Sequence, residues 1–80
     1  MLTIPRQKVL YAIYRTQRDY PRGRGLHVSE LHAEIGKLDD FDMTYLVKKQ
    51  FIEERNGYHT LTGTGIDEAE LYLLHHEGQS

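Results

Sequence analysis

Apolar residues at helical spacing near the start of the chain predict a first helix. One face of that helix consists of residues three and four positions apart, namely Val9, Leu10, Ile13 and Tyr14. Thr3 is placed to cap the helix, and Pro5 stands in the first turn, where a missing N–H does no harm. Because a residue before proline avoids the helical region, the helix must end before Pro21. We therefore expect a helix over residues 4–18.

A loop and a short second helix are expected next. Residues 21–25 hold a proline and two glycines, a composition typical of a loop. The apolar stretch over residues 26–28 suits one small strand. Ser29 is a good N-cap for a helix, and Gly36 tolerates the left-handed conformation that ends one. We expect this helix over residues 29–35.

A third helix is predicted over residues 40–50, with Asp39 or Asp40 as its cap. Its inward face is expected to consist of Met43, Leu46, Val47 and Gln50. Its outward face is expected to consist of Thr44, Tyr45, Lys48 and Lys49. Phe41 fits neither face well, so we expect it to pack from the turn before the helix.

Asn56-Gly57 between two β-prone runs predicts a hairpin over residues 51–62, because a type I′ turn needs positive φ at two successive positions. A two-residue loop determines the strand register, which pairs Ile52 with Leu61, Glu53 with Thr60, Glu54 with His59 and Arg55 with Tyr58. Ile52 and Leu61 then share a face and anchor the hairpin to the core. Glu54 and His59 can pair on that same face, nearer the tip.

The last helix is expected over residues 64–77, after glycines at positions 63 and 65 break the strand. Thr62 or Thr64 can cap it. One stripe of this helix is apolar and consists of Ile66, Ala69 and Leu73. Leu71 and Leu74 lie off that stripe, which indicates a second apolar side. The tail over residues 78–80 is expected to be loose.

Length and composition support one soluble globular domain over residues 1–80. The chain is 39% hydrophobic and 28% charged, and a chain this short needs a compact core. No apolar run approaches the ~20 residues that cross a bilayer, and no secretory signal is visible. We therefore expect a cytoplasmic protein with no membrane partner. Cysteine is absent, which excludes disulfides and thiolate metal sites.

The net charge of −2 is not typical of a nucleic-acid-binding protein, but the charges are distributed unevenly. Residues 1–25 carry six basic residues and one acid, whereas residues 26–80 carry four basic residues and eleven acids. Such an asymmetry can build a basic face on an acidic protein. Alternatively, both sets of charges simply solvate the surface.

Catalytic and metal chemistry find little support in the sequence. The five histidines include no pair at the i, i+4 spacing of a helical zinc site. Ser29 has no glycine-flanked nucleophile turn around it, and an 80-residue chain has little room for a catalytic pocket. We therefore expect a protein that is not an enzyme and has no metal site and no cofactor.

The order of elements resembles that of a winged helix-turn-helix. Residues 28–36 are similar to the capped first helix of the helix-turn-helix, and residues 51–55 resemble the run that enters the wing. Residues 61–65 resemble the segment that closes the wing in regulators of the MarR and PadR type. The resemblance covers residues 5–77. It implies a mainly α fold with a small β-hairpin, comprising a three-helix core, a two- to three-stranded wing and a C-terminal helix.

The resemblance also implies a transcriptional regulator that binds double-stranded DNA. The third helix would enter the major groove, and the wing would place Arg55 near a minor groove. The groove-facing residues would be Thr44, Tyr45, Lys48 and Lys49. Further phosphate contacts are open to Arg15, Arg18, Arg22 and Arg24, or these residues contact nothing. Because the last helix often builds a homodimer in related regulators, Leu71, Tyr72 and Leu74 are candidate dimer residues.

A winged-helix module that binds another protein, and not DNA, is the alternative. The net charge of −7 after residue 25 favours it, and Arg55 is the only basic residue of the predicted wing. Five acidic residues also lie in the predicted helix-turn-helix, namely Glu30, Glu34, Asp39, Asp40 and Asp42. A continuous basic strip from the third helix to the wing would favour DNA, and acids around that helix would favour a protein partner.

Overall fold

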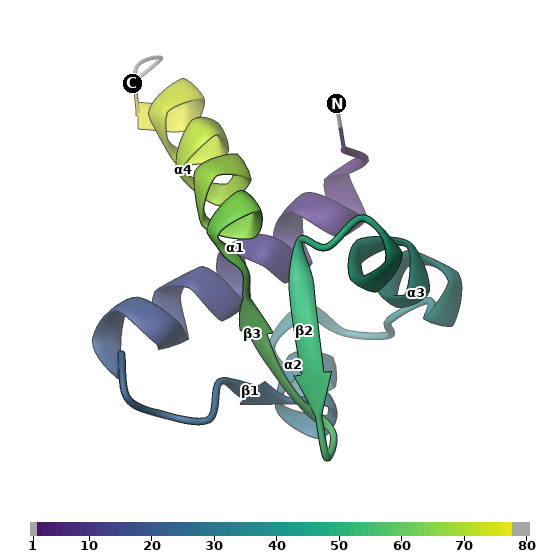
Figure 1. Ribbon diagram of the computed structural model, residues 1–80. Helices are drawn as coiled ribbons and strands as arrows, with labels where there is room; N and C mark the ends of the chain where they lie inside the picture. The colour runs from purple at the N-terminus through teal and green to yellow at the C-terminus, as the bar shows by residue number, and fades with distance from the viewer. Residues whose placement is uncertain (1, 78–80) are drawn as a thin grey trace.

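Four helices and a three-stranded antiparallel sheet form the described part of the chain in a computed structural model, which covers the backbone of residues 2–77 and the side chains of residues 2–73 (Figure 1). The helices are α1 (Ile4–Asp19), α2 (Val28–Ile35), α3 (Asp40–Lys48) and α4 (Gly63–Glu77). The strands are β1 (Leu26–His27), β2 (Ile52–Arg55) and β3 (Tyr58–Leu61). The expectation of a mainly helical protein with a small hairpin is confirmed. The predicted tail at residues 78–80 lies outside the described residues.

The hairpin has the register that the turn predicts. All four expected strand pairs are present, from Ile52 opposite Leu61 to Arg55 opposite Tyr58. Asn56 and Gly57 have φ of 54° and 85°, as a type I′ turn requires. β3 is the central strand of the sheet, because β1 pairs with its other edge. A wrong register would have moved the apolar residues to the solvent face.

The core-facing side of the hairpin differs from the prediction near its tip. Ile52 and Leu61 are buried, as expected. Glu54 and His59 are opposite each other in the backbone register, but the expected contact between their two described side chains is not seen. Instead, the Glu54 carboxylate accepts the Gly57 N–H at 3.3 Å, and a ring nitrogen of buried His59 lies 3.4 Å from a β1 carbonyl oxygen. The neighbouring backbone therefore satisfies both groups.

α1 lies at the centre of the packing. It contacts α2, α3, α4 and β3, so every layer of the protein meets it (Figure 1). The buried apolar side chains of the core are Leu2, Val9, Leu10, Ala12, Ile13, Leu26, Leu31, Leu46, Ile52, Leu61 and Ala69. A polar link joins α1 to the sheet, since the Gln17 side-chain oxygen accepts the Leu61 N–H at 2.9 Å. α2 and α3 are both packed against α1.

α3 ends at Lys48, two residues before the predicted end. The Phe51 N–H donates to the Leu46 carbonyl and the Gln50 N–H to the Val47 carbonyl, both at 3.0 Å. Gln50 adopts a φ of 61° between them. This is the Schellman arrangement that closes a helix with one left-handed residue. The chain therefore leaves the helix directly into β2.

α2 starts differently from the prediction, because its cap is His27 and not Ser29. His27 Nδ1 accepts the Ser29 N–H at 3.2 Å, and Glu30 Oε1 accepts the His27 N–H at 2.9 Å. This reciprocal arrangement is a capping box with histidine in the place that serine usually takes. The helix begins at Val28, directly after β1, so the short strand and the helix share one junction residue.

Replacing the His27 cap is expected to destabilise the protein. His27→Ala leaves an N–H of the first turn without its acceptor, so the free energy of unfolding should fall by about 1 kcal/mol. Urea denaturation followed by circular dichroism measures the change. His27→Asn removes the ring but keeps an acceptor, and it should recover most of the loss. Equal midpoints for the wild-type and alanine proteins would contradict this role of His27.

The start of α4 confirms one of the two predicted caps. Thr62 Oγ1 accepts the Gly65 N–H at 3.0 Å, so Thr62 and not Thr64 caps the helix. The Thr62 N–H donates to the Phe51 carbonyl at 3.1 Å, which continues the hairpin by one more pair. Within the described residues, no helix combines the length and the apolar character that a bilayer crossing requires.

Candidate nucleic-acid interface

The orientation of α3 determines which of its side chains meet solvent. Leu46 is completely buried and Met43 is partly buried, as predicted. Other expectations are wrong: Val47 is 42% exposed, and Phe41, expected to pack from the turn, is 71% exposed. Gln50, expected on the inward face, is exposed and lies beyond the end of the helix. Tyr45, expected on the outward face, packs partly against the core. Because Leu46 points at the core, Val47 is rotated away from it by the helical step of about 100° per residue. Phe41 stands on the side of α3 opposite the core.

One hollow on α3 brings most of the predicted site residues together. It has a volume of about 450 Å³ and is lined by Phe41, Thr44, Tyr45, Lys48 and Lys49. We call these five residues the α3 face. Four of them were predicted from the sequence, and Phe41 was missed. Phe41 precedes Thr44, Tyr45 and Lys48 by three, four and seven positions. Residues with these spacings lie on the same side of a helix, so the sequence could have placed Phe41 on this face.

Arg6 of α1 supports the α3 face from beside it. Its guanidinium carbon lies 3.8 Å from the centre of the Tyr45 ring, and its Nε donates to Asp42 Oδ1 at 2.8 Å. The Nζ of Lys49 also lies 5.9 Å from the centre of the Tyr45 ring. Arg6 therefore neutralises one acid of α3 and holds Tyr45 in place through a cation–π contact. The sequence shows Arg6 only as part of a basic segment.

Most of the acids in α2, in α3 and directly before α3 have local partners. Glu34 forms an ion pair with Arg15 of α1. Glu30 and Asp39 accept backbone N–H groups at the starts of α2 and α3, where the helix dipole favours negative charge. Asp42 is paired with Arg6, so four of the five acids interact with a basic side chain or a backbone N–H. Asp40 is the one for which no partner is seen among the described side chains.

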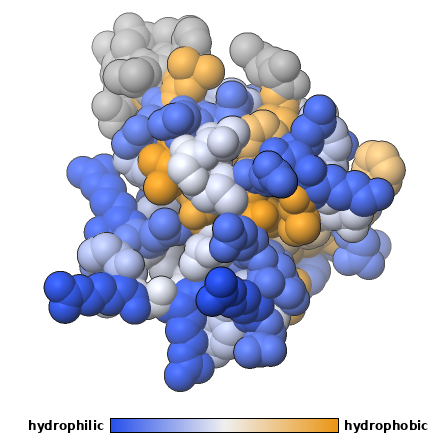
Figure 2. All heavy atoms as spheres, in the orientation of Figure 1, coloured by the Kyte–Doolittle hydropathy of each residue, from blue (hydrophilic) through white to orange (hydrophobic). Residues whose placement is uncertain are grey.

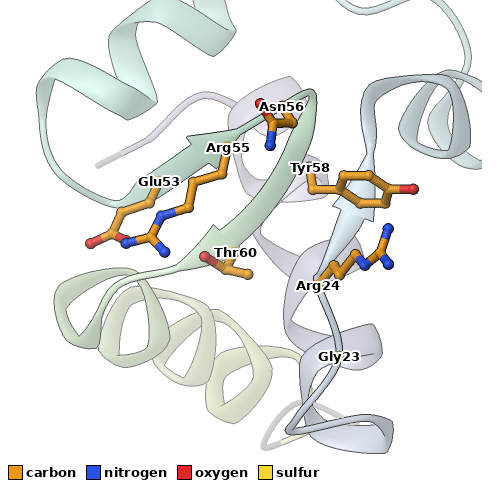
Figure 3. Close-up of a pocket in the computed structure, with 7 residues that line it drawn as sticks. All are labelled: Gly23, Arg24, Glu53, Arg55, Asn56, Tyr58 and Thr60. Atoms are coloured by element: carbon orange, nitrogen blue, oxygen red, sulfur yellow. The ribbon is translucent and has the colours of Figure 1, made fainter.

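The β2–β3 hairpin carries a second, separate surface near its tip. A hollow of about 500 Å³ on the outer side of the sheet is lined by Gly23, Arg24, Glu53, Arg55, Asn56, Tyr58 and Thr60 (Figure 3). Arg24 reaches it from the loop before β1, with its guanidinium carbon 5.6 Å from the centre of the Tyr58 ring. Figure 3 shows Arg55 extending along β2 towards Glu53 and away from Tyr58. The surface around the hairpin tip is hydrophilic (Figure 2).

The basic residues of α3 do not run continuously into the β2–β3 hairpin. A further hollow lies between α3 and the hairpin, and its lining includes Val47, Gln50, Glu53, Glu54 and Arg55. The carboxylates of Glu53 and Glu54 are both exposed. Arg55 is thus separated from the α3 face by an acidic stretch. The structure gathers four of the five predicted site residues on one face and places the fifth elsewhere.

The predicted dimer residues on α4 are divided by the fold. Leu71 is 48% exposed. Tyr72 packs partly against the core, and its hydroxyl oxygen accepts the Leu2 N–H at 3.1 Å. Burial is the main cause that raises the pKa of Tyr72 above its ordinary value. The Leu74 side chain lies outside the described residues, so the homodimer stays a prediction.

Comparisons of the chain with known protein families, with curated proteins and with solved structures found no match. Among the side chains that the structure describes, no three histidines or carboxylates are grouped as a metal ion would need.

Proposed function

We propose that this protein is a winged helix-turn-helix regulator that binds double-stranded DNA. In this proposal α3 is the recognition helix and the β2–β3 hairpin is the wing. The order of the elements supports the proposal, because it is the order that resembles a winged helix-turn-helix. The elements follow one another as α1, β1, α2, α3, β2, β3 and α4, and β3 is central in the sheet. Four residues of the α3 face are exposed and leave that side of the helix open to a partner, namely Phe41, Thr44, Lys48 and Lys49.

The observation that carries the proposal is the local charge of the α3 face. Lys48 and Lys49 are exposed, and within the described residues neither forms an ion pair. Of the two acids in α3, Asp42 is paired with Arg6, and Asp40 is the first residue of the helix, at the opposite end from the lysines. The face is therefore basic although the whole chain has a charge of −2. Such a local patch attracts a polyanion whatever the overall charge.

Each residue of the proposed site has a chemical role. Lys48 and Lys49 contact phosphates or guanine edges. Thr44 and Tyr45 hydrogen-bond to the backbone or to bases, with Tyr45 positioned by the Arg6 contact. Arg55 contacts the flanking minor groove from the wing tip.

A protein-binding module is the second candidate, and one observation favours it. The exposed acids Glu53 and Glu54 interrupt the basic surface between α3 and Arg55. A phosphate backbone would be repelled there, whereas a basic protein surface would be attracted. Absence of salt-dependent DNA binding would favour this candidate.

A salt titration tests the DNA proposal. Labelled duplex DNA is titrated with the protein at several salt concentrations, and affinity is followed by fluorescence anisotropy. Lys48→Ala combined with Lys49→Ala is expected to reduce the salt slope by about 2 and to weaken binding at low salt by about tenfold, because two phosphate contacts are lost.

A matched variant controls for net charge. Lys8→Ala with Lys37→Ala removes two exposed cations outside α3, so its total charge equals that of the α3 double variant. Its affinity and salt slope should stay much closer to those of the wild-type protein. If both double variants lose the same affinity, α3 is not the recognition helix. If the wild-type protein shows no salt slope, the DNA proposal is wrong.

A further inference from the structure

Phe41 is a large apolar side chain left in solvent at the start of α3. It is 71% exposed, whereas Leu46 of the same helix is completely buried in the core. An isolated exposed apolar residue needs no explanation on a protein surface. A role for Phe41 therefore depends on the side chains around it.

The ring of Phe41 lies among cationic and hydroxyl-bearing side chains. It lines the same hollow as Thr44 and Lys48, and the Arg6 guanidinium carbon lies 5.8 Å from its centre. Apolar atoms are visible on the surface at the α3 side of the molecule (Figure 2). A partner suited to this face must be anionic and must also present small apolar groups. The major groove of DNA has both, since phosphates line it and thymine carries a C5-methyl group.

The position of Phe41 in the helix suits contact with bases. It is the second residue of α3, and its N–H donates to the Asp39 carboxylate at 2.9 Å, so the first turn is firmly capped. In helix-turn-helix proteins the N-terminal residues of the recognition helix are the ones that reach base edges. Lys48 and Lys49 lie at the other end of α3, closer to where phosphates would be contacted.

We infer that Phe41, which lines the same hollow as Thr44, contacts thymine methyl groups in the major groove. The ring offers only apolar contact there, so the part of the site it reads must contain thymine. This inference rests on the proposed DNA binding and adds a specificity determinant to it. The apolar contact distinguishes thymine from uracil and from cytosine, neither of which has the methyl group.

Uracil substitution tests the inference. The best-bound duplex is first selected from a pool of random sequence. Each thymine of that duplex is then replaced singly by deoxyuridine, which removes only the methyl group. At one or more positions the wild-type protein is expected to bind about three- to fivefold more weakly, as the loss of one buried methyl group implies.

Two variants assign the effect to Phe41. With Phe41→Ala, the thymine and uracil duplexes should bind equally. With Lys48→Ala, both duplexes should bind more weakly while their ratio is preserved, because a phosphate contact is indifferent to the methyl group. Phe41 is largely exposed, so its replacement should leave the melting temperature nearly unchanged.

The outcomes separate this inference from the proposed function. Salt-dependent binding with no loss at any uracil position would overturn the inference and leave the DNA proposal standing. Methyl sensitivity that persists unchanged in Phe41→Ala would also overturn it. Failure of the wild-type protein to bind any duplex would overturn both.

Discussion

Gly65→Ala is expected to lower the free energy of unfolding by about 3 kcal/mol, a large effect for a domain of this size. A Cβ atom at Gly65 would overlap the carbonyl oxygen of Phe51. That oxygen is held in place, since it accepts the Thr62 N–H at 3.1 Å and lies 3.2 Å from the Thr62 hydroxyl. Because the obstacle is hydrogen-bonded backbone, relief requires α4 to move away from the hairpin.

Thermal unfolding followed by circular dichroism measures this effect. An alanine at position 65 should reduce the melting temperature by about 12–24 °C, given a shift of about 4–8 °C per kcal/mol. Gly63→Ala is the matched control, because Gly63 lies in the same first turn and its Cβ would meet nothing within 4 Å. The control should change stability by no more than about 1 kcal/mol, and in the favourable direction. Equal melting temperatures for the two variants would contradict the close contact of α4 with Phe51.

Leu46→Ala is expected to cost about 3 kcal/mol, within the range of about 2–5 kcal/mol for truncating a buried leucine. The Leu46 side chain is completely buried and extends from α3 into the core. Its removal leaves a cavity that the surrounding core can fill only partly. Urea denaturation gives the change in the free energy of unfolding.

Val47→Ala is the control for Leu46→Ala, since the two residues are adjacent on α3. Val47 is 42% exposed, so its truncation should change stability by about 0.5 kcal/mol or less. A larger cost for Val47 than for Leu46 would mean that α3 is rotated by about 100° from its place here. That rotation would also move Phe41 and Lys48 off the α3 face, so the comparison tests the site as well as the fold.

Local chemistry explains why much of the fold was predictable. The Asn56-Gly57 turn determines which residues of β2 and β3 face each other, and each expected pair is present. The ends of α1 follow from a proline near its start and another after its end. In each case a few neighbouring residues restrict the backbone, so no distant contact is needed.

The errors occur where neighbouring residues allow more than one answer. α3 itself carries apolar and aromatic residues on several of its sides. The spacing alone therefore does not determine whether Val47 or Tyr45 packs against the core. The fold places Tyr45 partly against the core and Val47 in solvent. At the start of α2, serine is the more usual cap, but His27 occupies the junction after β1 and takes that role.

The sequence by itself determined the order of the elements, the hairpin register and the presence of two adjacent lysines on the third helix. It did not determine the charge of the α3 face. Arg6 and Asp42 are 36 positions apart, and only the packing of α1 against α3 brings them within 2.8 Å. The exposure of Phe41 likewise depends on the rotation of α3 against the core. Local backbone preferences act over a few residues, whereas ion pairing and burial depend on which distant surfaces meet, so these features emerge only in the folded protein.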